Sequence, residues 1–322
     1  MKELLAKLLN IPAVAGNEER LTAFLVQELA AYCDHYTIDP LGSLIFHQKG
    51  EGEPILVNTP LSENGFFVTA VEENGRAKLA PIGNGEPGEL LHQKVRNVEG
   101  TIFGVVGSDK KEGTPEMSDL FLDLGYQKKE EGEALLTPPQ VFGVSGEILL
   151  LENQLFAPGL WSRVGVAVVI QGIKQLWKNH TQNLYFAFTV MDNLGFKGAK
   201  VAAQSLNPKE AYLVSGADPK AEGKPVVAGK GVGVRIKDSF AISNKPFRDQ
   251  VTQLLEEKKI SYQPEILTKG GLTNNEIMYL QQGILTVNLT VPVKNKGTAV
   301  EGVSLLDLEQ TTKGLVEILL AK

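Results

Sequence analysis

The sequence predicts an α/β protein in which one layered domain carries an inserted β-rich segment. From about residue 156 onward, helical and strand patterns alternate, which is typical of a layered domain with a largely parallel sheet. Between residues 66 and 155, short strand patterns follow one another, separated by glycine, asparagine and proline turns. Strands at such close spacing, without long helices, indicate a small barrel or sandwich.

The first 65 residues contain helical signals followed by short strands. Apolar residues between Leu21 and Leu29 recur at helical spacing, and we expect Asn17 to cap the first turn of that helix. TIDPLGSLIFHQKG then indicates two strands around a Pro-Leu-Gly turn, and PILVN a further buried strand. We expect these elements to pack with the C-terminal half.

Within the insertion, the ENG sequence at residues 73–75 lies between two strand patterns and predicts a hairpin. KKEEGEALL, at residues 128–136, is interpreted as a polar, solvated segment. No internal repeat or low-complexity linker separates the insertion from the remainder.

The C-terminal half alternates helices and strands. We expect helices over SRVGVAVVIQGIKQLW, GAKVAAQSL, NKPFRDQVTQLLEEKKI and SLLDLEQTTKGLVEILL, and strands over LYFAFTV, EAYLV and GILTVNLTV. The glycine-rich GKGVGV at residues 229–234 lacks the flanking strand and helix of a dinucleotide-binding loop, so we interpret it as a turn leading into a strand.

Composition narrows the possible partners. The chain has 322 residues and a net charge of -6, with both signs mixed along it, which argues against a nucleic-acid or membrane-surface partner. The apolar run near 164–170 is too short to cross a bilayer. The single cysteine, Cys33, cannot form an intrachain disulfide, so we expect a reducing compartment, the cytoplasm.

A series of segments resembles, in order and spacing, the tetrahedral, glutamyl or deblocking aminopeptidase family, sometimes labelled cellulase-like. The segments are IPAVAGNEERLTAFL, IDPLGSLIFHQKG, ENGFFVTAVEENG, APIGNGEPGELLHQKV, DLFLDLG, LWSRVGVAVVI, FTVMDNLGFKGAK, LTKGGLTNNEI and AVEGVSLLDLE. The resemblance implies a zinc-aminopeptidase-like three-layer α/β/α domain formed by residues 1–65 and 156–322. It also implies an inserted β-barrel, residues 66–155, that drives dimerisation and larger assembly.

The resemblance further implies two zinc or cobalt ions, held by two histidines and three carboxylates, with one glutamate as general base on a bridging water. Several positions that carry ligands or acidic neighbours in the family carry other side chains here. They are Pro60, Ser62, Trp161, Ser162, Asn193, Ser215 and Gly297. Since zinc needs imidazole, thiolate or carboxylate donors, we expect this chain to bind no metal cofactor.

Four charged residues of the family's pattern remain: Glu63, Arg163, Asp192 and Glu301. Asp192 stands at the general-base position, one methylene shorter than the family's glutamate. We expect the carboxylates of Asp192 and Glu301 to pair with Arg163. The four histidines, His35, His47, His92 and His180, fall at no ligand position, and we interpret them as surface or strand residues.

These substitutions predict a catalytically inactive homologue that binds a peptide or small molecule, or assembles with itself or with an active paralogue. A divergent aminopeptidase that uses Asp192 as base remains an alternative, as does a purely structural oligomer subunit. Serine hydrolysis by Ser62, Ser162 or Ser215 lacks an activating histidine, with Lys269 the one lysine worth considering. Glycosidase chemistry by Asp192 and Glu301 is also a weaker alternative.

Overall fold

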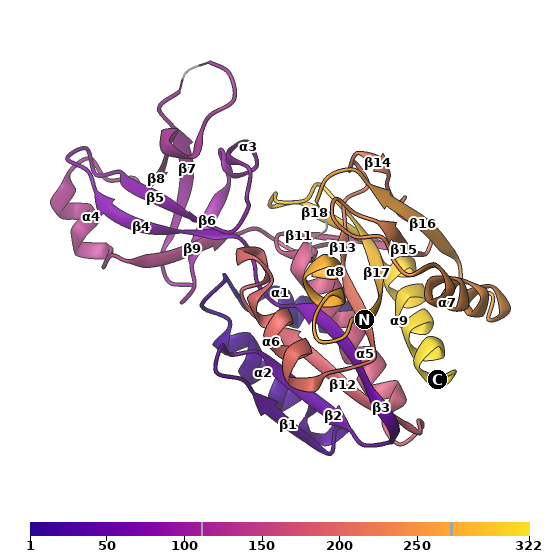
Figure 1. Cartoon of the computed structure of the whole chain (residues 1–322). Helices are drawn as coiled ribbons and strands as arrows, with labels where there is room; N and C mark the ends of the chain where they lie inside the picture. Colours follow the sequence, from indigo (N-terminus) through magenta and orange to yellow (C-terminus); the bar gives the residue numbers. More distant parts are fainter. Residues whose placement is uncertain (111, 271–272) are drawn as a thin grey trace.

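The computed structural model describes residues 1–110, 112–270 and 273–322. It consists of a large sheet with helices on both faces, joined to a separate closed barrel (Figure 1). The predicted fold class, an α/β domain with an inserted β-barrel, is thereby confirmed.

The large sheet has twelve strands among the described residues. Across it lie β1 (His35–Ile38), β2 (Leu44–Gln48), β12 (Gln182–Thr189), β3 (Glu51–Pro60), β13 (Glu210–Ala217), β17 (Leu285–Lys294), β15 (Val232–Lys237), β16 (Tyr262–Leu267) and β14 (Gly223–Lys224). The central strands β12, β3, β13 and β17 are parallel to their neighbours within this set. Three more strands, β10 (Leu149–Leu150), β11 (Gln154–Ala157) and β18 (Glu301–Ser304), extend the sheet from β17.

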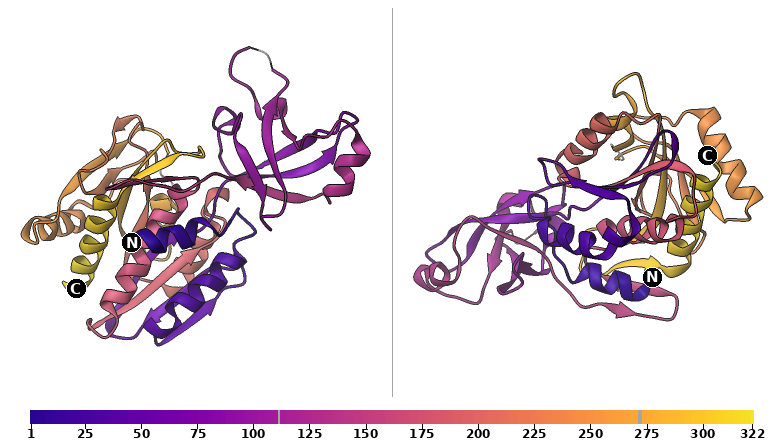
Figure 2. Two further views of the ribbon diagram at one scale, coloured as in Figure 1. Left: turned by 180° about the vertical axis from the view of Figure 1, so that it is seen from behind. Right: turned by 90° about the horizontal axis from the view of Figure 1, so that it is seen from below.

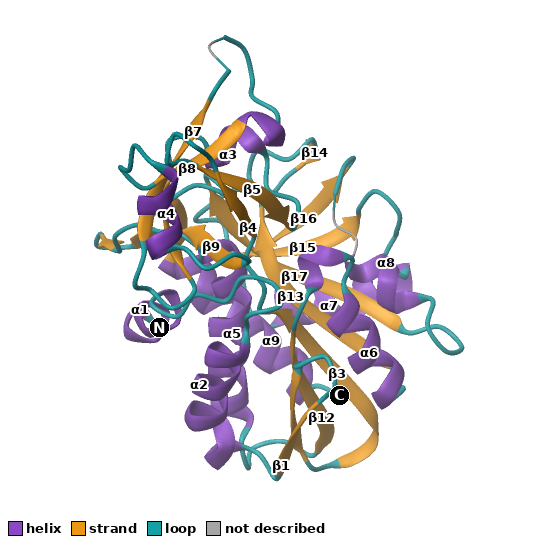
Figure 3. Ribbon diagram, turned by 90° about the vertical axis from the view of Figure 1, so that its left-hand side faces the viewer, coloured by secondary structure: helices purple, strands orange, loops and turns teal. Residues whose placement is uncertain are grey.

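Helices cover both faces of this sheet (Figures 2 and 3). One face is covered by α1 (Lys2–Leu9), α2 (Glu19–Leu29), α5 (Leu160–Leu176), α7 (Lys245–Glu257) and α9 (Leu305–Leu320), whose apolar residues share one core. The other face is covered by α6 (Lys197–Leu206) and α8 (Thr273–Met278), over a smaller core rich in alanine. The result is the predicted three-layer arrangement.

Helix α5 lies in the middle of the first layer and is buried along most of its length. Its residues from Val164 to Ile170 are apolar apart from glycine, so every face of that stretch can pack against the sheet or a neighbouring helix. The helix begins at Leu160 after Gly159, which has a φ of +79°. This buried helix fixes the position of residues 160–163, which the site below uses.

The barrel closes through β4 (Gly65–Val71), β5 (Ala77–Ile82), β8 (Leu120–Asp123), β7 (Phe103–Ser108), β6 (Lys94–Asn97) and β9 (Gln140–Val144), in that order. Its own core includes Phe66 and Phe142, whose rings stack with centroids 6.0 Å apart. Two short helices, α3 (Pro87–Leu90) and α4 (Lys129–Leu135), lie at its surface. The strands of the barrel thus run from Gly65 to Val144, while 66–155 as the limits of an independent unit stays a prediction.

Several local predictions can be compared with these elements. The ENG hairpin is confirmed, with the Gly75 amide donating to the Glu72 carbonyl. The capping prediction was wrong, because α2 begins at Glu19 with Glu18, not Asn17, at the cap position. KKEEGEALL forms the exposed helix α4. The LTKGGLTNNEI segment lies partly outside the described residues.

None of the helices in the described ranges is long and apolar enough to cross a membrane.

Candidate functional site

The sequence-predicted site residues lie where central strands leave the sheet. Strands β3 and β12 run parallel, with Pro60 paired to Thr189, so the segments that follow them emerge side by side. In open α/β sheets, ligands bind in the crevice beyond the carboxyl ends of such strands. The first turn of α5 and the loop before β18 border the same place through the hydrogen bonds described below.

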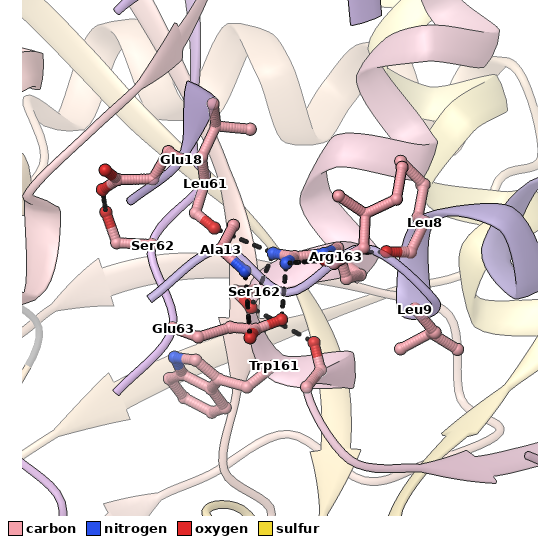
Figure 4. Close-up of polar contacts among 12 residues, drawn as sticks. Leu8, Leu9, Ala13, Glu18, Leu61, Ser62, Glu63, Trp161, Ser162 and Arg163 are labelled. Atoms are coloured by element: carbon pink, nitrogen blue, oxygen red, sulfur yellow. Dashed lines mark hydrogen bonds and ion pairs between the residues drawn. The ribbon is translucent and has the colours of Figure 1, made fainter. Parts of the chain in front are cut away.

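Arg163 is the centre of this polar group (Figure 4). Its side chain is fully buried, with 0% exposure, and its Nη2 lies 2.5 Å from Oε1 of Glu63. The guanidinium also donates to the carbonyl oxygens of Leu61, at 2.8 Å, and Ile11, at 3.1 Å. Buried charges of this kind persist because every donor finds a partner, so Arg163 ties α5 to the N-terminal segment and to the end of β3.

The ion pair corrects one prediction. Arg163 pairs with Glu63, and neither Asp192 nor Glu301 takes part in an ion pair with it among the described contacts. Glu301 instead accepts hydrogen bonds from two backbone amides, that of Trp161 at 2.7 Å and that of Gly297 at 2.6 Å. Because Trp161 lies in the first turn of α5, Glu301 caps that helix from outside it.

Glu18 is a site residue that the sequence analysis missed. It is buried, and its Oε1 accepts from the Ser62 hydroxyl at 2.6 Å and from the Met191 amide at 3.0 Å. Its Oε2 accepts from the Gly16 amide at 2.8 Å. No local pattern could reveal this role, because Ser62 is 44 residues away and Met191 is 173.

Asp192 follows Met191 in the chain, and its carboxylate differs from those of Glu18, Glu63 and Glu301 in its hydrogen bonding. It is 3% exposed, and neither of its carboxylate oxygens has a hydrogen-bond partner among the described residues. Burial, to which the neighbouring charge of Glu18 adds, raises the pKa of Asp192 to about 7. Asp192 is therefore the carboxylate of the group without fixed hydrogen-bond donors, although burial raises the pKa of Glu301 to about 7 as well.

Asn193 continues the polar group toward the barrel. Its Nδ2 donates to the Glu63 carbonyl at 2.9 Å and to Oδ1 of Asn64 at 2.8 Å, while its own Oδ1 has no partner in the described part of the chain. The amide thus holds together the segments after β3 and β12. Pro60 ends β3 itself, where it continues the register with β12.

Trp161 and the residues around Gly297 join the same group through Glu301. A Cβ added to Gly216 of β13 would lie 3.1 Å from Cε3 of Trp161, so the indole lies against the end of that strand, next to Ser215. Lys296 Nζ lies 4.5 Å from the centre of the indole ring. A Cβ at Gly297 would meet Oε2 of Glu89 at 2.2 Å, so a carboxylate from the barrel lies beside Gly297.

The serines predicted as weaker candidates are already engaged. Ser62 donates to Glu18, and the Ser162 hydroxyl donates to the Gly159 carbonyl at 3.2 Å. Lys269 forms an exposed ion pair with Glu222 at 3.2 Å. No base of the described chain contacts a serine here in the manner of a hydrolase triad.

The donor set was also compared with the needs of a metal centre. Within residues 1–110, 112–270 and 273–322, no group of three or more His, Cys, Asp or Glu side chains gathers in a metal-holding arrangement. The Asp192 carboxylate oxygens and the Asn193 Oδ1 are the atoms of this group that are buried without a hydrogen-bond partner among the described residues.

The known proteins that this chain resembles include several aminopeptidases. A sequence model of the M42 glutamyl aminopeptidases matches residues 42–313. A putative aminopeptidase of Acetivibrio thermocellus is 30% identical over 323 residues, covering 98% of this chain and 98% of that protein. The lysyl aminopeptidase of Pyrococcus furiosus is 26% identical, covering 97% of this chain and 94% of that protein.

Solved structures give the same result. The TET1 peptidase of Pyrococcus horikoshii, which can assemble into a tetrahedron or a large octahedral shell, superposes with a TM-score of 0.89 at 28% identity, over 100% of this chain and 99% of that one. The aminopeptidase APDkam598 of Desulfurococcus kamchatkensis superposes with a TM-score of 0.93 at 25% identity, over 99% and 94%. The structural relatives thus include large homo-oligomers.

These matches correct the expectation about cofactors. M42 aminopeptidases are metal-dependent, so the prediction that this protein uses no metal cofactor was wrong. That prediction inferred a cofactor's absence from substituted positions one at a time, which is a weaker guide than likeness over the whole chain.

Proposed function

The chain belongs to the M42 glutamyl aminopeptidase family, and from this premise we propose that the polar group around Arg163 and Asp192 forms a pocket that binds a peptide end or a small molecule without hydrolysing it. The observation that supports this is how the carboxylates are used. Glu63 holds Arg163, Glu18 holds Ser62 and the Met191 amide, and Glu301 caps α5. A carboxylate held by fixed donors would have to give them up before it could act on a substrate.

The side chains of this group also suit the binding of a peptide end. Asp192 and the Oδ1 of Asn193 offer acceptor oxygens without partners, and the Trp161 indole supplies an apolar wall. Pockets for small ligands combine apolar surface with a few polar groups that fix orientation. A peptide end, which carries both kinds of surface, fits this description.

The test is a paired activity and binding assay on the full chain. Because the relatives are metal-dependent, aminoacyl p-nitroanilides with acidic, basic and apolar side chains are assayed with and without added zinc or cobalt. We expect no turnover, together with saturable binding of short peptides by calorimetry. Turnover that scales with the added metal would contradict the proposal.

A second candidate is hydrolysis with Asp192 as the general base, and one observation favours it. A pKa of about 7 places the Asp192 carboxyl near the value at which a general base works best at neutral pH. If this candidate is correct, any activity found above is abolished by Asp192→Asn. Activity untouched by that change would exclude it.

We also propose that the chain assembles as a homo-oligomer, a dimer or larger, or together with an active relative. The assemblies of the structural relatives support this, as do Phe103 and Val105, which are 49% and 46% exposed on strand β7 of the barrel. Light scattering of the full chain should show a mass above that of a monomer. Phe103→Lys should reduce it, whereas the control Phe240→Lys, on a loop of the other domain, should not.

We place the protein in the cytoplasm, which its single cysteine supports. Fractionation of the native host tests this.

A further inference from the structure

Two histidines lie opposite each other at the edge of the large sheet, outside the pocket. His35 of β1 pairs with His47 of β2 in the antiparallel register, and His47 pairs with Tyr185 of β12. Residues directly opposite in an antiparallel pair project from the same face of the sheet, close enough for their side chains to meet. The three rings therefore form a row across the strands.

The two imidazoles approach through the same type of nitrogen. Nδ1 of His35 lies 3.4 Å from Nδ1 of His47, with the ring planes 81° apart. On its other side, Nε2 of His47 lies 2.7 Å from Oδ1 of Asn183. An amide oxygen can only accept, so Nε2 carries the hydrogen, and Nδ1 of the neutral ring has a free lone pair.

The separation suits a shared ion better than a hydrogen bond. Hydrogen bonds donated by N–H groups in proteins are typically shorter, about 2.7–3.2 Å to an oxygen acceptor. Two nitrogens bound to one metal at about 2.0–2.1 Å, with an angle between 90° and 110°, lie about 3.0–3.4 Å apart. The observed 3.4 Å matches the upper end of that range.

His47 is also oriented in the way of a metal ligand. Tyr185 stacks on its ring at 4.1 Å with planes 6° apart, and Asn183 accepts from the nitrogen that would not bind the ion. Metal-binding histidines usually donate their second N–H to such an acceptor, which fixes the tautomer and the ring direction. His35, by contrast, is exposed, so it can turn toward an ion and leave room for water.

Burial favours the neutral form of the His47 ring. Burial lowers the pKa of His47, and the charges of His35 and Lys49 lower it further, against the hydrogen bond that His47 donates to Asn183 and the charge of Asp34. The Oδ2 of Asp34 accepts from the Lys49 amide at 2.7 Å. A neutral imidazole is the form that binds metals.

We propose that His35 and His47 form a two-histidine site for a divalent transition-metal ion with a preference for nitrogen, with Cu²⁺ or Ni²⁺ favoured over Zn²⁺. No third His, Cys, Asp or Glu joins the pair within the described chain, so water completes the coordination. The site is separate from the pocket. Since β1 is bonded only to β2 within the described sheet, the ion would fasten this edge strand to its neighbour.

The test is a Cu²⁺ titration of the full chain, saturated beforehand with zinc so that any metal site in the pocket is filled. Electron paramagnetic resonance should show two nitrogen ligands on one copper. His35→Gln should weaken that site at least tenfold, and Asn183→Leu, which removes the acceptor for His47, should weaken it about 10–100-fold. His92→Gln, an exposed histidine of the barrel, is the matched control and should leave binding unchanged.

A second readout checks that the ion acts on the sheet edge. Hydrogen exchange of β1 amides should slow on adding Cu²⁺ to the wild type and not to His35→Gln. Copper affinity that is the same in wild type and His35→Gln, or a spectrum without nitrogen ligands, would overturn the proposal.

Discussion

Gly165 of α5 allows this helix to lie unusually close to the sheet, and replacing it should reveal how tightly the site is built. A Cβ at this position would lie 2.4 Å from Oγ1 of Thr59 and 2.5 Å from the carbonyl oxygen of Val214. The second atom belongs to the backbone of the central strand β13 and cannot rotate away. Gly165→Ala therefore forces α5 off the sheet by about 1 Å to restore ordinary contact.

The expected sign opposes helix propensity. In an exposed helix, Gly→Ala stabilises by up to about 1 kcal/mol. Overpacking of a core costs about 1–3 kcal/mol, and here the whole buried helix must shift, so we expect the upper end and a net loss of about 2 kcal/mol. The same helix provides the control. A Cβ at Gly172 would lie 3.3 Å from Cδ2 of Leu315, a side-chain atom that can move, so Gly172→Ala should be neutral or stabilising.

The assay is urea unfolding of both variants and the wild type, followed by the fluorescence of Trp161 and Trp177. These tryptophans stand at the two ends of α5, so they report on this helix. A Gly165→Ala protein as stable as the wild type would refute the reasoning. So would equal losses in the two variants, since the argument rests on backbone against side-chain contact.

Three further predictions follow from the site. Arg163→Met should cost about 3–5 kcal/mol of unfolding free energy in urea, because it leaves Glu63 and the carbonyls of Leu8, Ile11 and Leu61 without their donor. Arg76→Met, which breaks an exposed pair, should cost less than about 1 kcal/mol, and equal losses would contradict this. Because burial raises the pKa of Asp192 to about 7, the folded state holds a proton that the unfolded chain has lost, so stability should fall as pH rises from about 4 to 7. Burial also raises the pKa of Glu301 to about 7, so Asp192→Asn should reduce that slope without abolishing it, and an unchanged slope would count against the reasoning. Gly297→Ala, at a φ of +82° and facing Glu89, should lose about 1–2 kcal/mol by thermal or urea unfolding, and adding Glu89→Ala should recover only the part due to the clash.

Local patterns predicted the elements well wherever one segment settles its own structure. The helix expected over NKPFRDQVTQLLEEKKI is α7, Lys245–Glu257, and Asn244 caps it by accepting from the Phe247 amide at 3.0 Å. The turn reading of GKGVGV is also confirmed, since these glycines lead into β15. In both cases the decisive contacts lie within a few residues.

The site was harder to predict because its bonds join distant segments. The order of family-like segments located Glu63, Arg163, Asp192 and Glu301, but not their partners. Glu18 looked like an ordinary residue of a first turn, and its role depends on Ser62 and Met191 arriving beside it. Contacts between such distant segments leave no local signal in the sequence.

The parallel strands β3 and β12 stop together, with Pro60 beside Thr189, and the polar segments begin only beyond them. Most of the apolar core lies behind this line, although Leu61 and Val190 just beyond it also pack in the core, and the polar groups lie in front. Loops attached at such a border can be exchanged or lengthened without disturbing the interior packing. A laboratory that wished to give this scaffold a new specificity could therefore vary residues 193–195, but would have to keep Leu61 and Val190, which pack in the core, and Glu63, which holds Arg163.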